Sequence, residues 1–236
     1  MNLMMKYLLL CKILFSLSLL SRADTIALFD GKSLEGWEGD ARFWSVQDGV
    51  ITGKSTEAVP FEKPTFLVYK KQEFANFELT ISFRLLTENA NAGILYRADK
   101  KSDGFVGYQA NITTDSKSNG GLKELGGRQY FVKQGEKMMI GEGGQRKVAE
   151  LADPLETEKA QESIKHGEWN EYRVVADGKT LMHQINGFTT IKLEDNEKNR
   201  ARSKGWLALQ LHPGVSATVQ YKDCLLYTSP SPRDRG

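Results

Sequence analysis

The sequence predicts an all-β protein that folds as a two-sheet sandwich with one short helix. Roughly a dozen short segments alternate apolar and polar residues, which is typical of strands that bury one face. Asp177-Gly178 and Asn186-Gly187 lie between such segments, and these dipeptides predict tight hairpin turns of type I′. Only one stretch carries helix-start signals. A single closed barrel is the alternative that the same observations allow.

The first 23 residues are predicted to be a secretory signal peptide. Lys6 and Lys12 flank apolar runs, and a small-x-small cleavage site ends at Ala23. The apolar part is interrupted by Lys12 and is short for a membrane span. We therefore expect the mature protein to be exported, to the periplasm or out of the cell, and to meet a membrane only through the signal peptide during export.

The other end of the chain differs in character from the rest. Residues 224–236 match the conceptual translation of a transposon-type sequencing adapter, and a disordered Ser/Pro tail is the alternative. We expect this segment to be foreign to the domain, which then covers residues 24–223. Its last strand, Val215 to Lys222, ends without a turn signal and is expected to be truncated.

Composition suits one globular domain, with 236 residues of which 40% are hydrophobic and 26% charged. The two ends hold five of the 32 basic residues and one of the 30 acidic residues. The domain therefore has 27 basic and 29 acidic residues, and its net charge is −2. A nucleic-acid partner is therefore not expected. Cys11 and Cys224 also lie in these ends, so the domain is predicted to have no disulfide.

The predicted strands are bounded by turn residues. Phe77 to Leu85 has the clearest alternation, with five apolar residues on one face and four polar residues on the other. In chain order the predicted strands are Thr25 to Phe29, Phe43 to Val46, Val50 to Gly53, Phe66 to Tyr69, Phe77 to Leu86, Asn91 to Arg97, Gly107 to Ile112, Trp169 to Ala176, Thr180 to Ile185, Phe188 to Leu193, Gly205 to His212 and Val215 to Lys222.

The segment from Ile112 to about Asp153 loses the alternation and contains many glycines. We expect it to be a long functional loop, since loops of this length are uncommon in compact domains unless they serve a site. Asp153-Pro154 then predicts the start of a short helix that ends near Lys165, with Asp as the N-cap and Pro at the first helical position.

Three of the predicted strands carry polar side chains on one face. These are Arg97 in one strand, Gln109 and Asn111 in a second, and Gln210 and His212 in a third. If the strands share a sheet, the five side chains converge on one concave surface. His183, by contrast, falls on the apolar face of its strand and is expected to be structural.

Eight short motifs occur along the chain in a fixed order. They are Leu28 to Trp37, Trp44 to Val46 with Asp48 to Ile51, Asn76 to Leu79, Gly93 to Arg97, Gly107 to Gln109, Gly167 to Asn170, Ile185 to Gly187 and Leu209 to His212. These motifs and their order resemble those of the 3-keto-disaccharide hydrolase family, formerly domain of unknown function 1080. The resemblance implies a concanavalin A-like jelly-roll sandwich, bacterial export and action on 3-keto glycosides. Gln109 and Asn111 depart from the family's pattern, because many members have acidic residues there.

The implied chemistry needs a base and groups that stabilise an enediolate. A ketone at C3 of a sugar acidifies the hydrogen at C2, so that a base can remove it and the C1 substituent can leave by β-elimination before water adds. We expect His212 to be the base, although a strand-end histidine before proline can also be merely polar. Arg97 is expected to stabilise the enediolate, with an ordinary ion pair as the alternative.

Glu124 is the second candidate for the base, unless it is simply a solvated loop residue. The expected substrate-binding residues are Gln109, Asn111, Gln210 and Arg128, since amides and guanidinium groups suit sugar hydroxyls. No organic cofactor is expected. A divalent metal held by His212 and Glu124 stays open as an alternative.

Three functions are compatible with the sequence. The first is an exported enzyme that cleaves 3-keto glycosides, the second is a non-catalytic carbohydrate-binding module on the same sandwich, and the third is a cell-envelope interaction domain. The sequence contains no Glu-x-Asp-x-x-Glu strand, Gly-x-Ser-x-Gly elbow, P-loop or zinc-type Cys/His spacing. Product formation from a 3-keto glycoside would separate the first function from the second.

Overall fold

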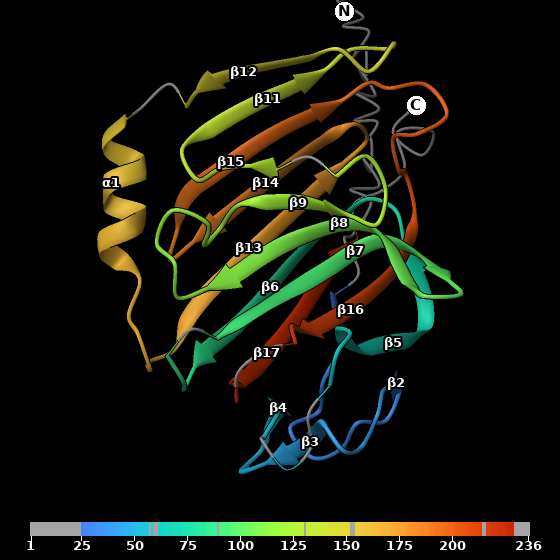
Figure 1. Ribbon diagram of the computed structural model, residues 1–236, viewed down its shortest axis with the longest axis vertical. Helices are drawn as coiled ribbons and strands as arrows, with labels where there is room; N and C mark the ends of the chain where they lie inside the picture. Colours follow the sequence, from blue (N-terminus) through green and yellow to red (C-terminus); the bar gives the residue numbers. More distant parts are fainter. Residues whose placement is uncertain are drawn as a thin grey trace, which may run out of the picture.

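The computed structural model describes residues 25–228, apart from 57, 59, 60, 89, 130, 152, 153, 214 and 215. Two β-sheets pack face to face, and one helix lies beside them (Figure 1). The prediction of an all-β, two-sheet jelly-roll sandwich with one short helix is confirmed. No helix in the described part of the chain is long and apolar enough to cross a membrane. The predicted signal peptide lies outside the described residues.

The larger sheet has ten strands, and all of its pairs are antiparallel except β11 with β15. Its order is β12-β11-β15-β14-β13-β6-β17-β4-β3, with β1 paired to β17. The strands are β1 (Thr25–Ala27), β3 (Trp44–Gln47), β4 (Val50–Lys54), β6 (Phe77–Leu85), β11 (Glu136–Ile140), β12 (Arg146–Glu150), β13 (Asn170–Asp177), β14 (Thr180–Ile185), β15 (Phe188–Asp195) and β17 (Thr218–Thr228).

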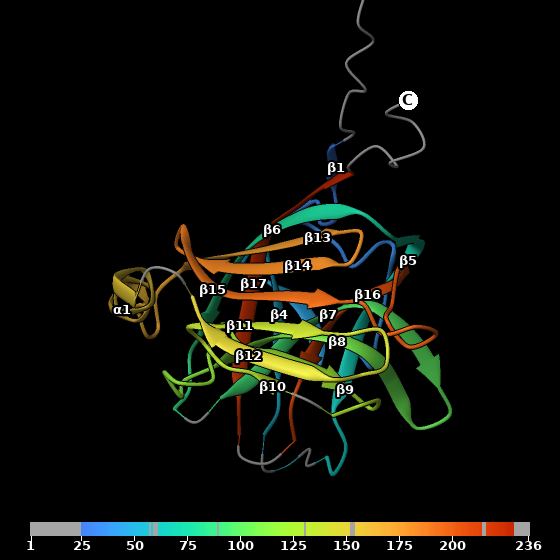
Figure 2. The same cartoon turned by 90° about the horizontal axis from the view of Figure 1, so that it is seen from above.

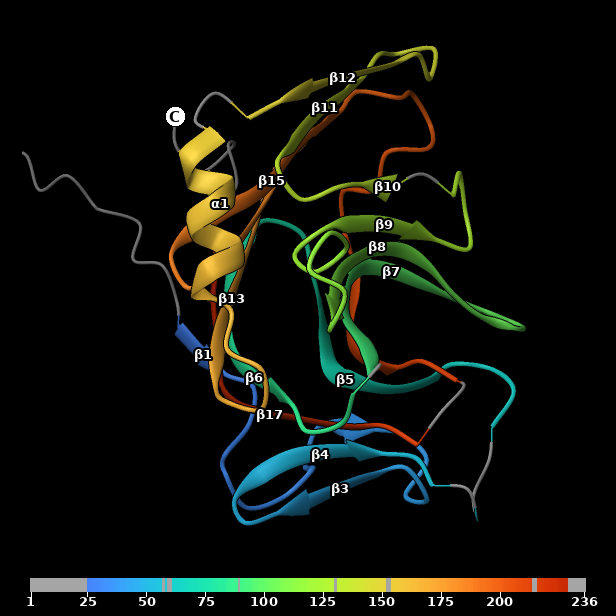
Figure 3. The same cartoon turned by 60° about the vertical axis from the view of Figure 1, so that its left-hand side comes forward.

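The smaller sheet has seven strands in the order β10-β9-β8-β7-β16-β5-β2. Helix α1 (Pro154–Ser163) packs against β14 and β15 of the other sheet (Figure 3). The strands of the smaller sheet are β2 (Trp37–Glu38), β5 (Thr65–Phe74), β7 (Asn91–Lys101), β8 (Gly104–Thr113), β9 (Leu122–Leu125), β10 (Phe131–Val132) and β16 (Gly205–Leu211).

The core lies between the two sheets and follows the period-two pattern of the strands. Strand β6 buries every second residue, from Phe77 to Leu85, as its alternation predicts. Each such side chain contributes about 1.5–3 kcal/mol when it is fully buried. The faces of the sheets that point away from this core are therefore the places where polar residues of a strand can meet a ligand.

Both predicted hairpins form, but with different turns. Asn186 and Gly187 have φ values of 49° and 85°, which matches the type I′ turn predicted between β14 and β15. Between β13 and β14, Asp177 pairs with Thr180, so the central residues are Gly178 and Lys179. Among the described residues of this turn only Gly178 has a positive φ, 53°, so the type I′ turn predicted there is wrong.

The segment predicted to be a long loop contains four strands, β9 to β12, so that prediction is wrong. The strands have between two and five residues and are separated by glycine turns, which hides their alternation. All five residues of β12 are exposed, because this strand forms the edge of the larger sheet. The expected helix is present as α1, while its proposed cap Asp153 lies outside the described residues.

The expectation that the last strand is cut at Asp223 is also wrong in this fold. Strand β17 runs on to Thr228 and pairs with β6 and β1 (Figure 2). A β-bulge with Asp223 at φ 51° shifts the register, and Cys224 and Leu226 then point into the core. Residues 229–236 lie outside the described part of the chain.

Leu226→Ala should lower the free energy of unfolding by about 2–5 kcal/mol, because the side chain is 0% exposed and its loss leaves a cavity. Leu225→Ala is the matched control, since this neighbour is only partly buried. Urea denaturation of both variants measures the difference. Equal and small effects would mean that residues beyond Asp223 are not part of the folded core.

His183 is structural, as predicted, and lies between two buried tyrosines. Its Nε2 is 2.9 Å from Tyr96 Oη and its Nδ1 is 3.1 Å from Tyr172 Oη, and the imidazole is 0% exposed. Burial lowers the pKa of His183 to about 3. The histidine is therefore neutral in the folded protein, whereas in the unfolded chain it titrates near ~6.5.

Mild acidification should therefore destabilise the fold through His183. Below about pH 6.5 the unfolded chain binds a proton that folded His183 does not, so the free energy of unfolding should fall with pH by up to about 1.4 kcal/mol per unit. Urea denaturation between about pH 6.5 and 5 measures this slope. His166→Gln, at an exposed histidine, should keep the slope, and His183→Gln should lose it. A slope that survives in His183→Gln would contradict this assignment.

Candidate functional site

The smaller sheet separates the residues that the sequence predicts for the site. Gln109, Asn111 and Gln210 alternate with core residues on β8 and β16, so they point away from the core. Glu124 is paired with the core residue Tyr108 and therefore points between the sheets. The predicted convergence is correct for these three residues, whereas Glu124, the second candidate for the base, points to the opposite face of the sheet.

The outer face of this sheet carries a group of residues that we call the polar patch, which comprises Asn91, Gln109, Asn111, Gln210 and His212. Gln210 on β16 pairs with Gly93 on β7, and Gly93 pairs with Asn111 on β8. The backbone N–H of His212 donates to Asn91 O over 3.0 Å and so continues the β16–β7 ladder. The patch therefore spans three neighbouring strands.

Gly93 makes room for the centre of the polar patch. A Cβ at this position would lie 2.6 Å from Nε2 of Gln109, which is closer than real Cβ atoms come. The Gln109 amide therefore lies over the glycine, between Gln210 on one side and Asn111 on the other. A glycine is needed here because of this close approach.

Three carboxamide oxygens of the patch are buried and have no hydrogen-bond partner among the described residues. They belong to Asn91, Gln109 and Gln210, and the glutamine side chains are 3% and 1% exposed. An unpaired buried polar group costs about 1–3 kcal/mol, so such groups in a folded protein call for a partner. Asn111 differs, since its Nδ2 donates to Ser118 O over 2.9 Å. The patch thus contains three hydrogen-bond acceptors that receive no donor from the described residues.

His212 lies at the exposed end of the patch. Its Nδ1 is 2.8 Å from Pro213 O, and a carbonyl oxygen can only accept, so Nδ1 carries the proton. In the neutral ring Nε2 then holds the free lone pair. This hydrogen bond orients the imidazole and leaves one nitrogen able to act as a base.

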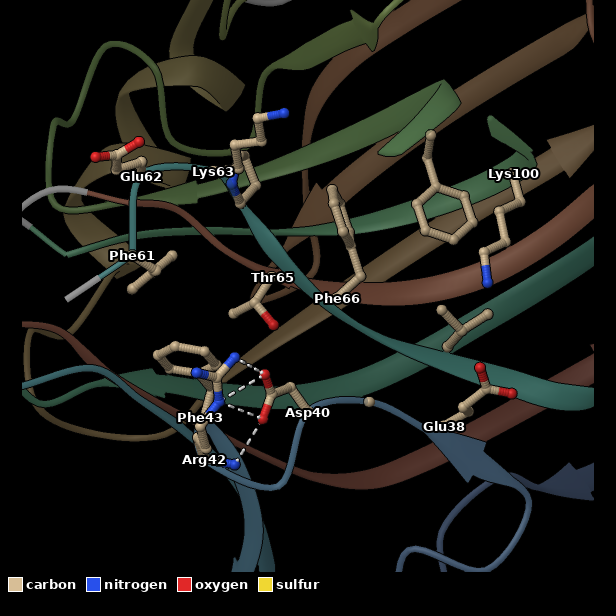
Figure 4. A pocket seen from close by; sticks show the side chains of 14 residues that line it. Glu38, Asp40, Arg42, Phe43, Phe61, Glu62, Lys63, Thr65, Phe66 and Lys100 are labelled. Carbon is tan, nitrogen blue, oxygen red and sulfur yellow. Dashed lines mark hydrogen bonds and ion pairs between the residues drawn. The ribbon is translucent and has the colours of Figure 1, made fainter. Parts of the chain in front are cut away.

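A pocket of about 730 Å³ adjoins the polar patch, and we call it the edge pocket (Figure 4). Its floor includes Phe66, Val68 and Phe105, and Phe66 pairs directly with Gln210 in the sheet. Charged side chains form its rim, among them Glu38 and Lys100. The polar patch and the edge pocket therefore lie on the same outer face of the smaller sheet.

Glu124 and Arg128 belong to a buried ion network inside the sandwich, and their predicted contact with substrate has no support in this geometry. Arg128 Nε donates to Glu124 Oε1 over 3.0 Å, and Nη2 lies 2.6 Å from Asp195 Oδ2. Glu197 accepts a further bond from Arg128 Nη1 over 2.9 Å. The side chains of Glu124, Arg128 and Asp195 are each 2% exposed, so a single guanidinium pairs with two buried carboxylates away from solvent.

Asp195 is held ionised by this network. Burial acts to raise the pKa of this carboxyl group, but hydrogen bonds from Arg128 and Tyr108 outweigh it and keep the pKa below the usual value. Tyr108 donates to Asp195 Oδ2 over 2.5 Å. These contacts join the two sheets at one end of the sandwich.

Arg97 does not reach the polar patch either. A β-bulge between Tyr96 and Asp99 turns it from the outer face, and its φ is 46°. The guanidinium is 1% exposed in the fold and donates to Ala75 O and Gly178 O over 2.8 Å each. These bonds connect the loops at Ala75 and Gly178 to the sheet, so the polar patch lends no support to the predicted role of Arg97 in holding an enediolate.

Sequence reasoning missed three features of this surface, namely Asn91, Gly93 and the edge pocket. Side chains alternate between the two faces along β7, so the same alternation that places Gln109 and Gln210 outward also places Asn91 and Gly93 outward. These two positions could therefore have been predicted from the sequence. Within the described part of the chain, no three His, Cys, Asp or Glu side chains are grouped so that they could hold a metal ion. His212 and Glu124, the pair named as an alternative metal site, lie on opposite faces of the sheet.

Comparisons with known proteins agree with this architecture. The family model described as a 3-keto-alpha-glucoside-1,2-lyase-like domain matches residues 24–226. A 3-keto-disaccharide hydrolase from Bacteroides thetaiotaomicron is 26% identical over 175 residues, which cover 68% of this chain and 55% of that protein. The chain therefore corresponds to little more than half of the length of this relative.

Two solved structures are similar in fold. One is a candidate glycosyl hydrolase from Parabacteroides distasonis ATCC 8503, with a TM-score of 0.57, 19% identity, and 87% of this chain and 94% of that chain covered. The other is the carbohydrate-binding module CBM66 from Bacillus subtilis, with a TM-score of 0.52 and 17% identity. The match covers 82% of this chain and 96% of that chain. At these identities the likeness extends to the sandwich fold alone.

Proposed function

Since the chain belongs to the family of 3-keto-alpha-glucoside-1,2-lyase-like domains, we propose that it cleaves 3-keto glycosides at the polar patch. The hydrolase name of the relative supports a hydrolase in the broad sense. The observation that carries the specific proposal is a set of three carboxamide oxygens that have no partner among the described residues, beside a histidine whose Nδ1 is hydrogen-bonded and whose Nε2 holds the lone pair. Sugar hydroxyls donate and accept hydrogen bonds, and so can satisfy these amides.

The first step is removal of the proton at C2. Nε2 of His212 takes this proton, and the electron pair of the C2–H bond moves to form an enediolate whose charge lies on the C3 oxygen. The pair then returns to form the C1–C2 double bond while the C1–O bond breaks. The departing oxygen takes up a proton, which the imidazolium of His212 can donate.

The second step restores a saturated sugar. Water adds its oxygen to C1 and C2 regains a proton, so that the sum of both steps is hydrolysis of the glycosidic bond. Gln109 and Gln210 position the sugar through its hydroxyls, and Asn91 lies beside His212 at the end of the patch. Because the amides are buried and fixed before substrate binds, little ordering is needed at the moment of reaction.

The proposed setting is outside the cytoplasm. The apolar segment and small-x-small site within residues 1–23 support export, and N-terminal sequencing of exported protein should then begin at Asp24. Material that begins elsewhere, or that stays in the membrane, would contradict this part of the proposal.

Incubation with a matched pair of sugars tests the function. The protein should release glucose from 3-keto-trehalose and leave trehalose itself intact, because only the ketone acidifies the C2 hydrogen. The second candidate function, a carbohydrate-binding module, is favoured by the likeness of the fold to CBM66. Binding of both sugars without release of glucose from either would support that function and overturn the proposed one.

A further inference from the structure

We propose that the edge pocket is a subsite for the leaving sugar, a neutral pyranose unit, and that it makes the protein selective for disaccharides over simple alkyl glycosides. This inference rests on the proposed cleavage at the polar patch. It assigns a substrate class and specificity residues, Phe66, Phe105 and Lys100, to a part of the surface outside the catalytic group.

The position of the pocket suits the second unit of a disaccharide. Phe66 lies directly opposite Gln210 in the β5–β16 pair, where Cβ atoms are about 4.5–5.5 Å apart. A sugar held by Gln210 and Gln109 therefore has its neighbour over the floor of the pocket. Both lie on the outer face of one sheet, on the neighbouring strands β5 and β16.

The floor is a preformed apolar platform. The rings of Phe66 and Phe105 have centroids 4.9 Å apart at an interplanar angle of 61°. Beneath them, Leu95 and Ala208 belong to a second apolar cluster that is separate from the main core. Carbon-bound hydrogens on one face of a pyranose can pack on such a platform, while its hydroxyls point sideways.

The walls provide a donor and an acceptor on either side of this floor. Lys100 pairs with Phe105 in the β7–β8 hairpin, and Glu38 pairs with Val68. Neither Lys100 nor Glu38 makes an ion pair among the described residues, so both are available to hydroxyl groups. Ligand pockets typically combine an apolar lining with a few such polar groups.

The charge of the lining indicates a neutral ligand. Three basic residues are balanced by three acidic residues, and Arg42 is already bound to Asp40 through two nitrogens (Figure 4). A phosphate or uronate would meet as much repulsion as attraction here. The volume of about 730 Å³ lies within the range of roughly 300–1,000 Å³ that small-molecule pockets occupy.

Selectivity kinetics test the subsite. The substrates are 3-keto-trehalose, which has a second sugar, and methyl 3-keto-α-glucoside, which lacks one. Phe66→Ala should lower kcat/KM about tenfold on the disaccharide and leave it within about twofold on the methyl glycoside. Lys100 is exposed, so Lys100→Ala should not destabilise the fold. This variant should lower kcat/KM on the disaccharide about threefold to tenfold.

Lys101→Ala is the matched control, because Lys101 is the adjacent exposed lysine and does not line the pocket. It should leave both substrates unchanged. Equal losses on both substrates in Phe66→Ala and Lys100→Ala would overturn the subsite while the proposed function stands.

A binding measurement separates failure of the subsite from failure of the proposed function. Titration of wild-type protein with trehalose, followed by NMR, should perturb signals of the pocket residues, and Phe66→Ala and Lys100→Ala should both weaken this binding. If wild-type protein cleaves neither 3-keto substrate but shows this pattern, the subsite stands and the proposed function fails. Unchanged trehalose affinity in both variants would overturn the subsite.

Discussion

His212→Gln should lower turnover of a 3-keto glycoside by roughly 10²–10⁴, which is the usual contribution of a general base. Glutamine keeps the approximate size and some hydrogen bonding of histidine but cannot take up the C2 proton. Substrate affinity should change little, because the interaction of the base with the substrate grows only as the proton moves. Steady-state kinetics together with a direct binding titration separate the two quantities.

Two further variants give this experiment its controls. His166→Gln removes an exposed histidine elsewhere and should leave turnover unchanged. Gln210→Leu removes a patch amide that is 1% exposed and should weaken binding, since hydroxyls then lose their partner. Wild-type turnover in His212→Gln would exclude this histidine as the base.

Arg128→Met should be the most destabilising of the changes considered, at about 3–5 kcal/mol. The substitution leaves the carboxylates of Glu124 and Asp195 buried without their counter-charge, and an unpaired buried ion costs far more than the pair contributes. Thermal and urea denaturation at neutral pH measure the effect. Because the network lies inside the sandwich, the loss should appear in stability rather than in the chemistry of the outer face.

Arg42→Met is the matched control for this prediction. Arg42 binds Asp40 with the same planar guanidinium, but it is an exposed pair at the rim of the edge pocket. Exposed pairs of this kind contribute little to stability. If Arg128→Met proved no more destabilising than Arg42→Met, the buried network would not hold the sandwich together.

Much of the fold was predictable because alternation reports directly on burial. Strand β6 follows its sequence pattern residue by residue, and Asn186-Gly187 forms the expected turn. The pattern is weak where strands are short or lie at an edge, which explains why β12, with every residue exposed, was predicted to be loop. Residues after Asp223 were misjudged because a single bulge lets Cys224 and Leu226 resume the core pattern.

The site was predictable only in part, for similar reasons. The alternation of side chains along β8 and β16 correctly places Gln109, Asn111 and Gln210 on one outer face. It fails for Arg97, since a bulge reverses the side chain after Tyr96, and no local signal in the sequence marks that bulge. Phe105 was missed because a largely buried phenylalanine in a strand is usually a core residue, and only the tertiary structure reveals a second apolar cluster on the other face.

The most direct test of proton removal at the polar patch uses 3-keto-trehalose that carries deuterium at C2 of the ketosugar. In single turnovers with enzyme in excess, the deuterated substrate should react measurably more slowly than the protonated one, because the C2–H bond breaks in the first chemical step. Direct hydrolysis at C1 leaves that bond intact throughout. Equal single-turnover rates for the two substrates would therefore contradict the proposed mechanism.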